Sequence, residues 1–599
     1  MKLTRIFISN FRNFHEVDVV LNGNAVIVGE NRVGKSNLLH ALRLIFDPSL
    51  PDSARQLGQG DFWDGLGEPL EDEKITVFVE LQEFEDDLDL LAQLTDFRLD
   101  EDPNTVRLTY EFRPIPGLDG FPQSDSDYEF LCYGGEAETK RFGYEVRRRI
   151  AMDLLPALRD AEGDLATWRR SPLRSLLERA FARVPAEGLE GVRAAVQEAT
   201  GKLADFPPVQ GLEQALRELY ASMSGPRQDI EPSLGFSTTD VRRLFRNLRL
   251  LIDGGLRTIS EASLGSANVA FLTLKTLELR QLMSENRRDH SLLAIEEPEA
   301  HLHPHLQRSV YRHLFEELAG EEGEQPLSLL LTTHSPHIAS VAPLRSLVLL
   351  RDTASDGSVA TSAASIDLSN DEEEDLARYL DVTRAEMLFA RGIILVEGDA
   401  EKFLLPVFAS SMGHDLDHLG ITVCSVAGTN FTPYAKFLTA LGIPFSIVTD
   451  WDPQAGRRPL GYNRSWRLVK VIEEARTGED QEELIRAIKE IEGYNDFSDR
   501  CEMHGVFTNV NTLEVDIFRD EDFTAAVIET LREQSFSAER QAWVNQWEAD
   551  PGSLELENYL TLIEAVGKGR FAQRLASRIE GIVPPSYIAR AITHVTDRV

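Results

Sequence analysis

Glycine, lysine and serine near the N-terminus are spaced as in a phosphate-binding loop. Residues 29–36 read Gly-Glu-Asn-Arg-Val-Gly-Lys-Ser and fit the pattern G-x-x-x-x-G-K-S. An apolar run at 25–28 precedes the loop and a helical pattern at 37–43 follows it, which is the context that the motif requires. Backbone N–H groups would wrap the phosphates, Lys35 would reach the β- and γ-phosphates, and Ser36 would bind Mg²⁺. We expect ATP to contact Gly29, Asn31, Gly34, Lys35, Ser36 and Asn37. A glycine turn without a ligand is the alternative interpretation.

Further along the chain, two carboxylates follow another apolar run. Residues 291–297 read Ser-Leu-Leu-Ala-Ile-Glu-Glu, so a buried strand would deliver Glu296 and Glu297 at its C-terminal end. Glu296 would hold the Mg²⁺ shell, and Glu297 would polarise the attacking water. A third apolar run, at 329–333, ends in His334, which is suited to sensing a γ-phosphate. The three pieces together predict hydrolysis of the nucleotide. A plain acidic loop and a structural histidine are the alternatives.

A second set of carboxylates lies in the C-terminal third of the chain. A strand-like run ends in Glu397, Glu401 follows one helical turn later, and a later run ends in Asp450-Trp451-Asp452. The i, i+2 spacing of the aspartates places both on one side of an extended chain. Carboxyl ends of strands in open α/β sheets form ligand sites, and clustered carboxylates are best explained by Mg²⁺ or Mn²⁺. The pattern therefore predicts a metal site, although any one of these pairs alone would be a solvated acidic turn.

The elements that must position these residues fall into four parts. Residues 1–150 contain strand-like runs at 6–8, 17–21, 25–28, 75–81 and 106–112. Residues 151–230 are rich in Ala, Leu, Arg and Glu at helical spacing and predict a helical insert. Strand–helix alternation resumes in residues 231–375, which end in an acidic segment, 352–375, that we expect to be a solvated linker. Residues 376–599 form a new strand–helix series and predict a separate α/β domain.

Composition restricts the class of protein. The 599 residues are 42% hydrophobic and 27% charged, as in globular proteins, and no apolar stretch of about 18 residues predicts a membrane span. The N-terminus has no signal-peptide pattern, and the three cysteines form neither a metal motif nor a disulfide framework. We therefore expect a cytoplasmic protein without a membrane partner.

The net charge of −37 argues against a nucleic-acid partner unless positive charge is concentrated locally. One basic segment follows Asp452 and includes Trp466; it contains Arg457, Arg458, Arg464, Arg467 and Lys470. We expect this segment to contact DNA phosphates. The helical region offers a second set, interleaved with apolar residues: Arg147, Arg148, Arg149, Arg169, Arg170, Arg174, Arg179 and Arg183. For that set an amphipathic helix face is an equally good interpretation.

The nucleotide-site pieces together resemble ABC-type ATPases of the SMC/RecF kind, and residues 6–14 resemble the first strand and turn of that group. Ser263 and Gly265 lie where such proteins carry a signature sequence, although the segment departs from the usual Ser-Gly-Gly core. In this group the signature of one protomer caps the nucleotide held by the other, so the resemblance implies a homodimer with the insert as its dimerisation region. Glu296 stands where the group usually has aspartate.

The order Glu-Gly, Glu and then Asp-x-Asp resembles the Toprim domain of topoisomerases, primases and certain nucleases. Its fusion to an ABC ATPase resembles the OLD (overcoming lysogenization defect) family of nucleases over nearly the whole chain. This resemblance implies two-metal phosphodiester hydrolysis with Glu397, Glu401, Asp450 and Asp452 as ligands. It adds Glu514 to the metal site and assigns Lys568 to the pentavalent phosphate or the leaving oxygen.

The expected function is thus a metal-dependent DNA endonuclease controlled by an ABC-type ATPase, in defence against phage or in DNA repair. A helicase-like partner accompanies some relatives, and the sequence leaves open whether one is encoded near this protein. The alternative is an ATP-dependent DNA-binding or sensing factor of the RecF/SMC type, with the Toprim fold as a non-catalytic docking domain. The complete carboxylate set favours the nuclease, because a docking surface has no physical reason to keep four mutually repelling carboxylates.

Overall fold

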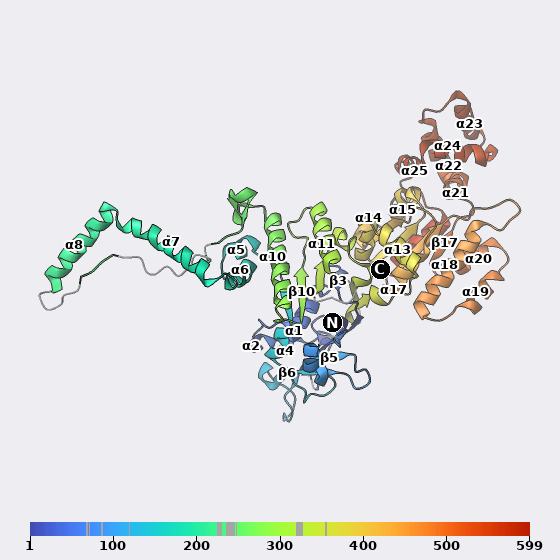
Figure 1. The fold of residues 1–599 in the computed structure, drawn as a ribbon. Helices are drawn as coiled ribbons and strands as arrows, with labels where there is room; N and C mark the ends of the chain where they lie inside the picture. The colour runs from blue at the N-terminus through green and yellow to red at the C-terminus, as the bar shows by residue number, and fades with distance from the viewer. Residues whose placement is uncertain are drawn as a thin grey trace. The chain divides into compact units, whose positions relative to one another are not determined.

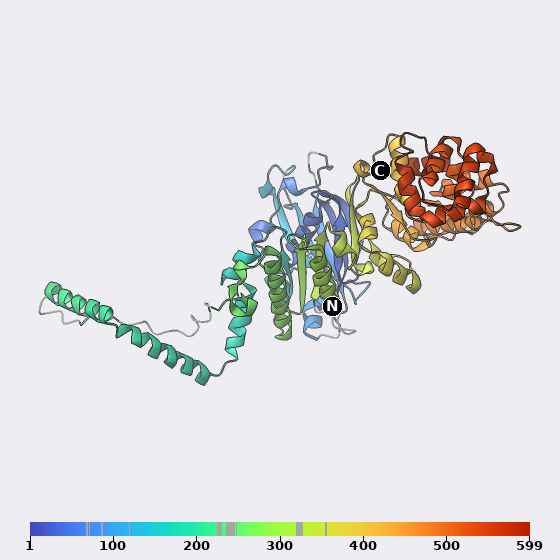
Figure 2. The same ribbon diagram turned by 90° about the horizontal axis from the view of Figure 1, so that it is seen from above.

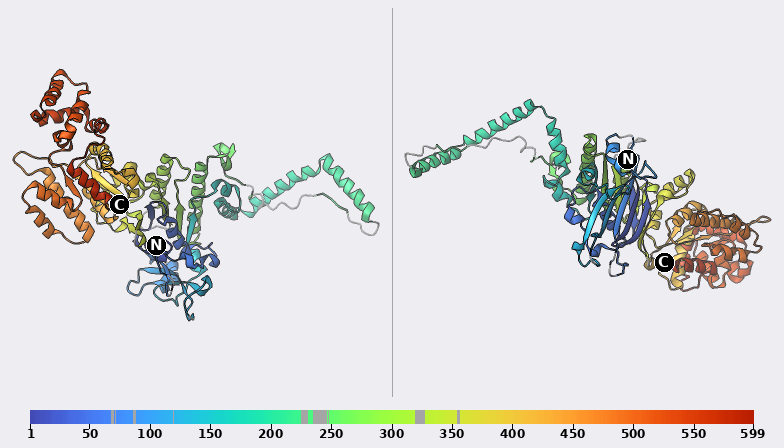
Figure 3. Two further views of the ribbon diagram at one scale, coloured as in Figure 1. Left: turned by 180° about the vertical axis from the view of Figure 1, so that it is seen from behind. Right: turned by 90° about the horizontal axis from the view of Figure 1, so that it is seen from below.

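The computed structural model of the chain describes residues 1–67, 70, 72–85, 88–118, 120–224, 231–234, 246, 248–318, 327–353 and 356–599. The chain divides into two compact units. The first comprises Met1–Leu155, Leu292–Glu299 and Pro304–Val599, and the second comprises Pro156–Ser291 and Ala300–His303. Figures 1, 2 and 3 show the elements of both units. Within the described ranges, none of the helices has the length and apolar character needed to cross a bilayer.

The larger sheet of the described chain is a mixed one with eleven strands. In spatial order they are β6 (Tyr128–Gly134), β5 (Val106–Pro114), β4 (Ile75–Gln82), β1 (Lys2–Phe11), β2 (Phe14–Val20), β13 (Gly357–Ser362), β12 (Leu347–Thr353), β3 (Ala25–Gly29), β11 (Leu327–Thr333), β10 (His290–Glu296) and β7 (Ile150–Leu155). The first six of these pair antiparallel with their neighbours, whereas β3 runs parallel to both β11 and β12. All five strands expected in residues 1–150 are present.

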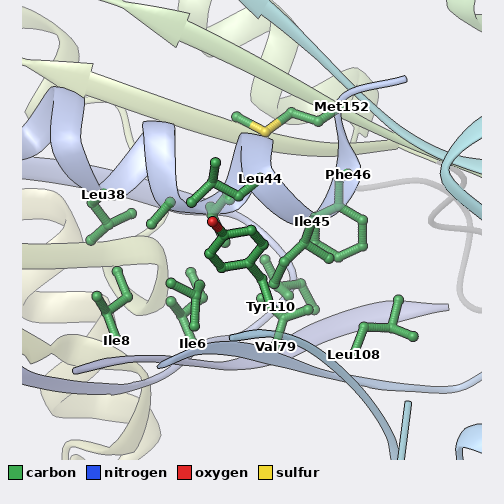
Figure 4. Close-up of a cluster of buried hydrophobic side chains, with 14 of the residues drawn as sticks. Ile6, Ile8, Leu38, Leu44, Ile45, Phe46, Val79, Leu108, Tyr110 and Met152 are labelled. Atoms are coloured by element: carbon green, nitrogen blue, oxygen red, sulfur yellow. The ribbon is translucent and has the colours of Figure 1, made fainter. Parts of the chain in front are cut away.

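Helix α1 (Lys35–Phe46) packs its apolar face on the antiparallel strands. Leu38, Leu42 and Ile45 repeat at helical spacing and are buried. Figure 4 shows side chains of this helix, among them Leu38 and Ile45, in one buried cluster with residues of β1, β4 and β5, Tyr110 included, and with Met152 of β7. The helix ends at Asp47, whose backbone is extended, because the following Pro48 disfavours the helical conformation there. This packing fixes the helix N-terminus beside the end of β3.

The acidic segment 352–375 is not the solvated linker that we expected. It contains β13, which pairs with β12, and helix α13 (Asn370–Tyr379). Ser369 caps this helix by accepting from the N–H of Glu372, whose carboxylate accepts from the N–H of Ser369. Asp371, Glu372 and Glu373 lie in its first turn, where the helix dipole stabilises negative charge. A capping box and not disorder therefore explains the acidic run.

The second unit is mainly helical and runs beyond the predicted insert at 151–230, and β7 extends the large sheet past residue 150. Its longer helices are α5 (Ala161–Ala166), α6 (Pro172–Ala182), α7 (Ala186–Ala204), α8 (Pro207–Ser224) and α10 (Leu264–Ser284), with the short pair β8 (Leu251–Ile252) and β9 (Arg257–Thr258). Figure 3 shows α7 and α8 in teal. The insert boundary that we placed near residue 230 lies outside the described residues.

The smaller sheet is fully parallel, in the order β15 (Ile421–Ser425), β14 (Gly392–Val396), β16 (Phe445–Thr449) and β17 (Val506–Thr508). A buried apolar cluster joins β14 and β16 to α15 (Asp399–Ser411), which lies between them in the sequence, and to the helices after residue 512. The helices of this region are α14 (Val382–Ala385), α15 (Asp399–Ser411), α16 (Leu416–Leu419), α17 (Thr432–Ala440), α18 (Leu460–Thr477), α19 (Glu482–Lys489), α20 (Tyr494–Glu502), α21 (Leu513–Arg519), α22 (Glu521–Arg532), α23 (Ala538–Ala549), α24 (Leu556–Val566), α25 (Lys568–Ala576) and α26 (Ser586–Thr596). The remaining helices of the first unit are α2 (Asp52–Arg55), α3 (Leu88–Leu94), α4 (Tyr144–Arg149), α11 (Pro304–Leu318) and α12 (Pro336–Ala339). Figure 2 shows the last helices of the chain in red.

The structure predicts a stability cost for any side chain at Gly34. This residue precedes α1 with φ 90°, and a Cβ would lie 2.2 Å from Asn13 Nδ2. We expect Gly34→Ala to lower the free energy of unfolding by about 1–3 kcal/mol, measured by urea denaturation without nucleotide. Gly60→Ala is the control, because a Cβ there meets no atom within 4 Å. Equal losses for the two variants would contradict the argument.

Candidate functional site

The nucleotide-site residues meet at the carboxyl ends of three adjacent strands. The loop Gly29–Ser36 follows β3, His334 follows β11, and Glu296 ends β10. The parallel register places Thr333 beside Val28, so His334 comes next to the start of the loop. Residues separated by some three hundred positions in the sequence thus surround one sheet edge, as the order of motifs predicted.

The loop itself is shaped for close approach of backbone N–H groups. Gly29 has φ 152°, and a Cβ there would lie 2.3 Å from the carbonyl oxygen of Leu350. Asn31 and Ser36 are exposed. Lys35 is 7% exposed and folds back on the loop, donating to the carbonyls of Gly29 at 3.0 Å and Glu30 at 2.6 Å. A nucleotide phosphate would offer Lys35 a charged acceptor in place of these neutral ones.

Asn37 and the turn between β1 and β2 brace the loop. Asn37 donates to Asn13 at 2.8 Å and accepts from Arg12 at 2.8 Å. Asn13 in turn donates to the hydroxyl of Ser358 on β13 at 2.8 Å. The side chain of Asn37, which we expected to contact nucleotide, is therefore engaged in holding the first turn of α1.

Glu297 and His334 lie together, and Glu299 holds the histidine in place. His334 Nε2 is 3.8 Å from Glu297 Oε1, and burial lowers the pKa of this histidine. Glu299 accepts from the backbone N–H of His334 at 2.6 Å and from the hydroxyl of Thr333 at 2.8 Å. Glu297 is half exposed and has a positive φ of 41°, whereas Glu296 is partly buried at the strand end. Our sequence reasoning did not assign Glu299, although it lies in the same Glu-Glu-Pro-Glu segment.

The candidate signature residues belong to the second unit. Ser263 caps α10 by accepting from the N–H of Ser266 at 3.2 Å. Gly265 is packed so closely that a Cβ would lie 2.7 Å from the carbonyl oxygen of His301. A capped helix start with a required glycine is the local geometry that a phosphate-facing signature needs, and its role toward a nucleotide stays a prediction.

The second set of carboxylates surrounds the carboxyl end of the parallel sheet. Glu397 follows β14 and accepts from the N–H of Asp450 at 2.9 Å and the hydroxyl of Thr449 at 2.5 Å. Asp450 follows β16 and accepts from Asn509, after β17, and from the N–H of Leu513 at 3.1 Å. The ends of three strands are thereby tied together through carboxylate oxygens.

Three of these carboxylates are buried near one another. Glu401, Asp450 and Glu514 are 7%, 8% and 3% exposed. Burial, reinforced by neighbouring carboxylates, raises the pKa of Glu401 to about 7. Burial likewise raises the pKa of Asp450 well above its ordinary value, and Glu397, Glu401 and Glu514 add to the effect. The repulsion expected from the sequence is therefore present.

The donor set fits a divalent cation. Among the described residues, no three His, Cys, Asp or Glu side chains are already placed as a complete set of ligands. Glu514 Oε2, however, is a buried carboxylate oxygen without a hydrogen-bond partner. Such an oxygen is costly unless a cation or water meets it. Carboxylate oxygens are also the ligands that Mg²⁺ and Mn²⁺ prefer, so the chemistry of these side chains suits such ions.

Lys568 joins this group from the start of α25. Its Nζ lies 3.3 Å from Glu514 Oε1. Burial opposes its charge, but Glu514 and Asp450 outweigh that effect and raise the pKa of the lysine. Glu401 also accepts from the N–H of Gly398 at 3.2 Å, so it caps α15 as well as facing the other carboxylates. The two late residues that only resemblance suggested are thus brought to the strand-end carboxylates.

The prediction that Asp450 and Asp452 lie on one side of an extended chain was wrong. Asp452 has φ 48°, so the chain is not extended at the second aspartate and the i, i+2 rule does not apply there. Asp450 and Asp452 have different surroundings, since the first is buried and the second keeps 31% of its side chain exposed. Asn509 was missed because it precedes no recognisable motif, yet it is buried and also accepts from the N–H of Trp451 at 2.8 Å.

The basic residues differ from the expected phosphate-binding surface. Arg464 points into the carboxylates and donates to Glu397 and Asp452. Lys470 pairs with Glu474 and Asp480, whereas Arg457 and Arg467 are exposed. In the helical region several arginines have partners within the protein: Arg147 donates to the carbonyl of Ile45, Arg174 pairs with Glu178, and Arg179 and Arg183 pair with Glu285. For these four the amphipathic-helix interpretation is favoured.

Two segments of the chain match known family models. Residues 25–340 match the family model described as "AAA domain, putative AbiEii toxin, Type IV TA system". Residues 388–452 match "Overcoming lysogenization defect protein-like, TOPRIM domain". The OLD nuclease of Thermus scotoductus is 26% identical over 75% of this chain and 82% of its own length, and endonuclease GajA of Bacillus cereus is 23% identical over 78% and 79%. The solved C-terminal region of the Xanthomonas campestris OLD protein is 42% identical over 35% of this chain and 95% of its own, with a TM-score of 0.31.

The buried Lys35 predicts a pH dependence of stability. Burial lowers its pKa to about 8 from 10.5. Between these values the unfolded chain binds a proton that the folded chain does not, so this residue makes stability rise with pH in that window. We expect the difference in unfolding free energy between wild type and Lys35→Met to grow by about 1–3 kcal/mol in favour of wild type from pH 8 to 10.5. Urea titrations without nucleotide measure it, and a constant difference would show that Lys35 keeps its ordinary pKa.

Proposed function

The chain belongs to the OLD family, in which an AAA-type ATPase domain is joined to a TOPRIM domain, and we therefore propose that it is a metal-dependent DNA endonuclease controlled by ATP. The observation that carries the proposal is the group of buried carboxylates beside Lys568 at the carboxyl end of the small parallel sheet. A structural core gains nothing from several buried like charges, whereas phosphodiester chemistry with divalent cations needs them. The naming of two relatives as nucleases supports the same reaction.

The protein's own residues have separable roles in this proposal. Glu397, Glu401, Asp450, Asp452 and Glu514 would hold two divalent ions, Mg²⁺ or Mn²⁺. When bound, such ions activate water and stabilise the leaving oxygen. Lys568, kept protonated by its acidic neighbours, would hold the negative charge of the scissile phosphate. Asn509 and Thr449 fix the orientation of Asp450 and Glu397.

The nucleotide site has the parts for hydrolysis. The loop amides and Lys35 would bind the phosphates, with Ser36 and Glu296 beside the Mg²⁺ that accompanies ATP. Glu297 would orient the attacking water, and His334, held by Glu299, would contact the γ-phosphate. Ser263 and Gly265 of a second protomer would complete the site, so we propose a homodimer joined through the helical insert. A cytoplasmic location agrees with the three buried free cysteines. A role in phage defence or repair, with a helicase-like partner, stays a prediction.

A physical connection between the two sites supports control by ATP. Glu30, inside the phosphate loop, accepts two hydrogen bonds from Arg391, at 2.7 and 3.0 Å. Arg391 immediately precedes β14, the strand that Glu397 follows. The backbone carbonyl of Glu30 is also an acceptor for Lys35. A nucleotide that draws Lys35 away therefore acts on the residue that holds the base of β14.

A cavity beside the phosphate loop also supports control by ATP. It has a volume of about 470 Å³ and is lined by Gly29, Asn31 and His334 together with Phe389. Phe389 ends the 3-10 turn Glu386–Phe389, two residues before Arg391. A bound nucleotide would thus contact the segment that leads into the TOPRIM sheet. The alternative function, a DNA-binding factor with an inert docking domain, gives no reason for the buried carboxylates.

A supercoiled-plasmid assay with Mg²⁺ or Mn²⁺, with and without ATP, tests the proposed activity. We expect Asp450→Ala to reduce nicking at least 100-fold while ATP turnover continues. Glu297→Gln should have the opposite effect: ATP turnover should be lost while nicking continues, because the fold and the nuclease site are untouched. Nicking that persists in Asp450→Ala would show that the carboxylates do not take part in cleavage. Absence of nicking by the wild type in every condition would refute the endonuclease.

The connection predicts a selective effect of Arg391→Gln. Because both partners are about half exposed, the ion pair contributes little to stability, under about 1 kcal/mol. We expect unfolding and basal nicking to stay near wild type, whereas the ratio of nicking rates with and without ATP changes about five-fold or more. Arg378→Gln, which breaks an exposed pair with Glu374 on α13, is the control. An unaltered ATP effect in Arg391→Gln would show that the sites communicate elsewhere.

A further inference from the structure

Arg464 occupies a position that its sequence context does not suggest. It lies in the first turns of α18, within a basic segment, yet only 13% of its side chain is exposed. One terminal nitrogen, Nη1, donates to Glu397 Oε1 at 2.5 Å, to Thr449 Oγ1 at 2.5 Å and to the backbone carbonyl of Asp450 at 3.1 Å. The other, Nη2, donates to Asp452 Oδ2 at 2.9 Å.

A single guanidinium therefore joins three segments of the chain. Glu397 follows β14, Thr449 ends β16, and Asp452 lies in the turn after it. Arg464 contacts one oxygen of each carboxylate, Oε1 of Glu397 and Oδ2 of Asp452. The two nitrogens of the fork thus set where two carboxylates from different segments stand relative to each other.

The chemistry of this contact requires arginine. The guanidinium is planar, carries donors in a rigid fork and stays charged at every physiological pH. A lysine would keep the positive charge, but its single ammonium group on a flexible stem could not hold two separate carboxylates in a defined arrangement. Charge compensation and geometry can therefore be separated by the Arg464→Lys substitution.

We propose that Arg464 is a positioning residue of the nuclease site, which holds Glu397 and Asp452 in the arrangement needed to bind divalent cations. The inference rests on the proposed metal-dependent nuclease and goes beyond it by assigning a role that is neither ligand nor DNA contact. Hydrogen-bond partners that orient metal ligands typically change metal affinity or activity about 10–100-fold when they are replaced. Arg464 has this relation to two ligands at once.

Direct binding of Mn²⁺ to the full-length protein tests the proposal, with free Mn²⁺ measured by electron paramagnetic resonance. We expect Arg464→Lys to weaken Mn²⁺ binding about 10–100-fold although the charge is retained. Arg476→Met, which breaks the pair with Glu473 on the same helix, should bind Mn²⁺ as wild type does. Unchanged binding by Arg464→Lys would overturn the proposal. Tighter binding would overturn it as well, because it would show that the guanidinium only competes with the cation.

Plasmid nicking distinguishes positioning from contact with DNA. With Arg464→Lys, raising Mn²⁺ by the same factor should restore the rate, while KM for DNA and its salt dependence stay unchanged. The opposite result would be a raised KM for DNA that added Mn²⁺ does not correct, together with a salt dependence of DNA binding whose slope is smaller by about one. That result would assign Arg464 to a contact with a DNA phosphate and overturn the inference.

Thr449→Val provides a second variant that keeps Arg464 intact. It removes the hydroxyl that lies between the guanidinium and Glu397 with little change of shape. We expect Mn²⁺ binding to weaken in the same direction as in Arg464→Lys, with an unfolding midpoint close to wild type. Wild-type affinity in a folded Thr449→Val would count against the network. Failure of the wild type itself to bind Mn²⁺ would refute the proposed function, whereas binding by wild type and by Arg464→Lys alike refutes only this inference.

Discussion

Negative charge gathered at the carboxyl end of the small parallel sheet is the constraint on which this structure depends. Glu401, Asp450 and Glu514 are buried, and the raised pKa of Glu401 and Asp450 records burial and mutual repulsion. The chain opposes this repulsion with a few hydrogen-bond donors, among them Asn509, Lys568 and Arg464. Each of these donors compensates part of the buried negative charge.

The nucleotide site also buries charge, but there the buried charge is positive. There the protein keeps a buried positive group, Lys35, and satisfies it with the carbonyls of Gly29 and Glu30 until phosphates replace them. Both sites lie at carboxyl ends of parallel strands, where loop amides and helix starts converge. The ion pair between Glu30 and Arg391 joins the phosphate loop to the start of β14, and the strand itself leads from there to Glu397 at its other end.

The net charge of −37 is compatible with a DNA substrate because the acidic residues are not all exposed to it. Part of the negative charge is buried at the proposed metal site, and part stabilises helix starts, as in α13. Arg457 and Arg467, which follow Asp452 in the sequence, remain exposed. Overall acidity then limits binding elsewhere on the surface.

The sequence by itself determined where both candidate sites lie along the chain, because each depends on short runs whose spacing encodes strand, turn and helix. Residues 29–36 and the ends at Glu297, Glu397 and Asp450 could be read in this way, and the strands before them formed as expected. Only the tertiary structure decided how residues without a local pattern act. The sequence indicated a surface cation at Arg464 and an extended backbone at Asp452, and it assigned no role to Asn509. The acidic run at 370–375 looked like a linker, and its role came from a cap at Ser369 and from packing. Periodicity reports which side of an element is buried, but the partner of a charged side chain depends on contacts between segments distant in the sequence.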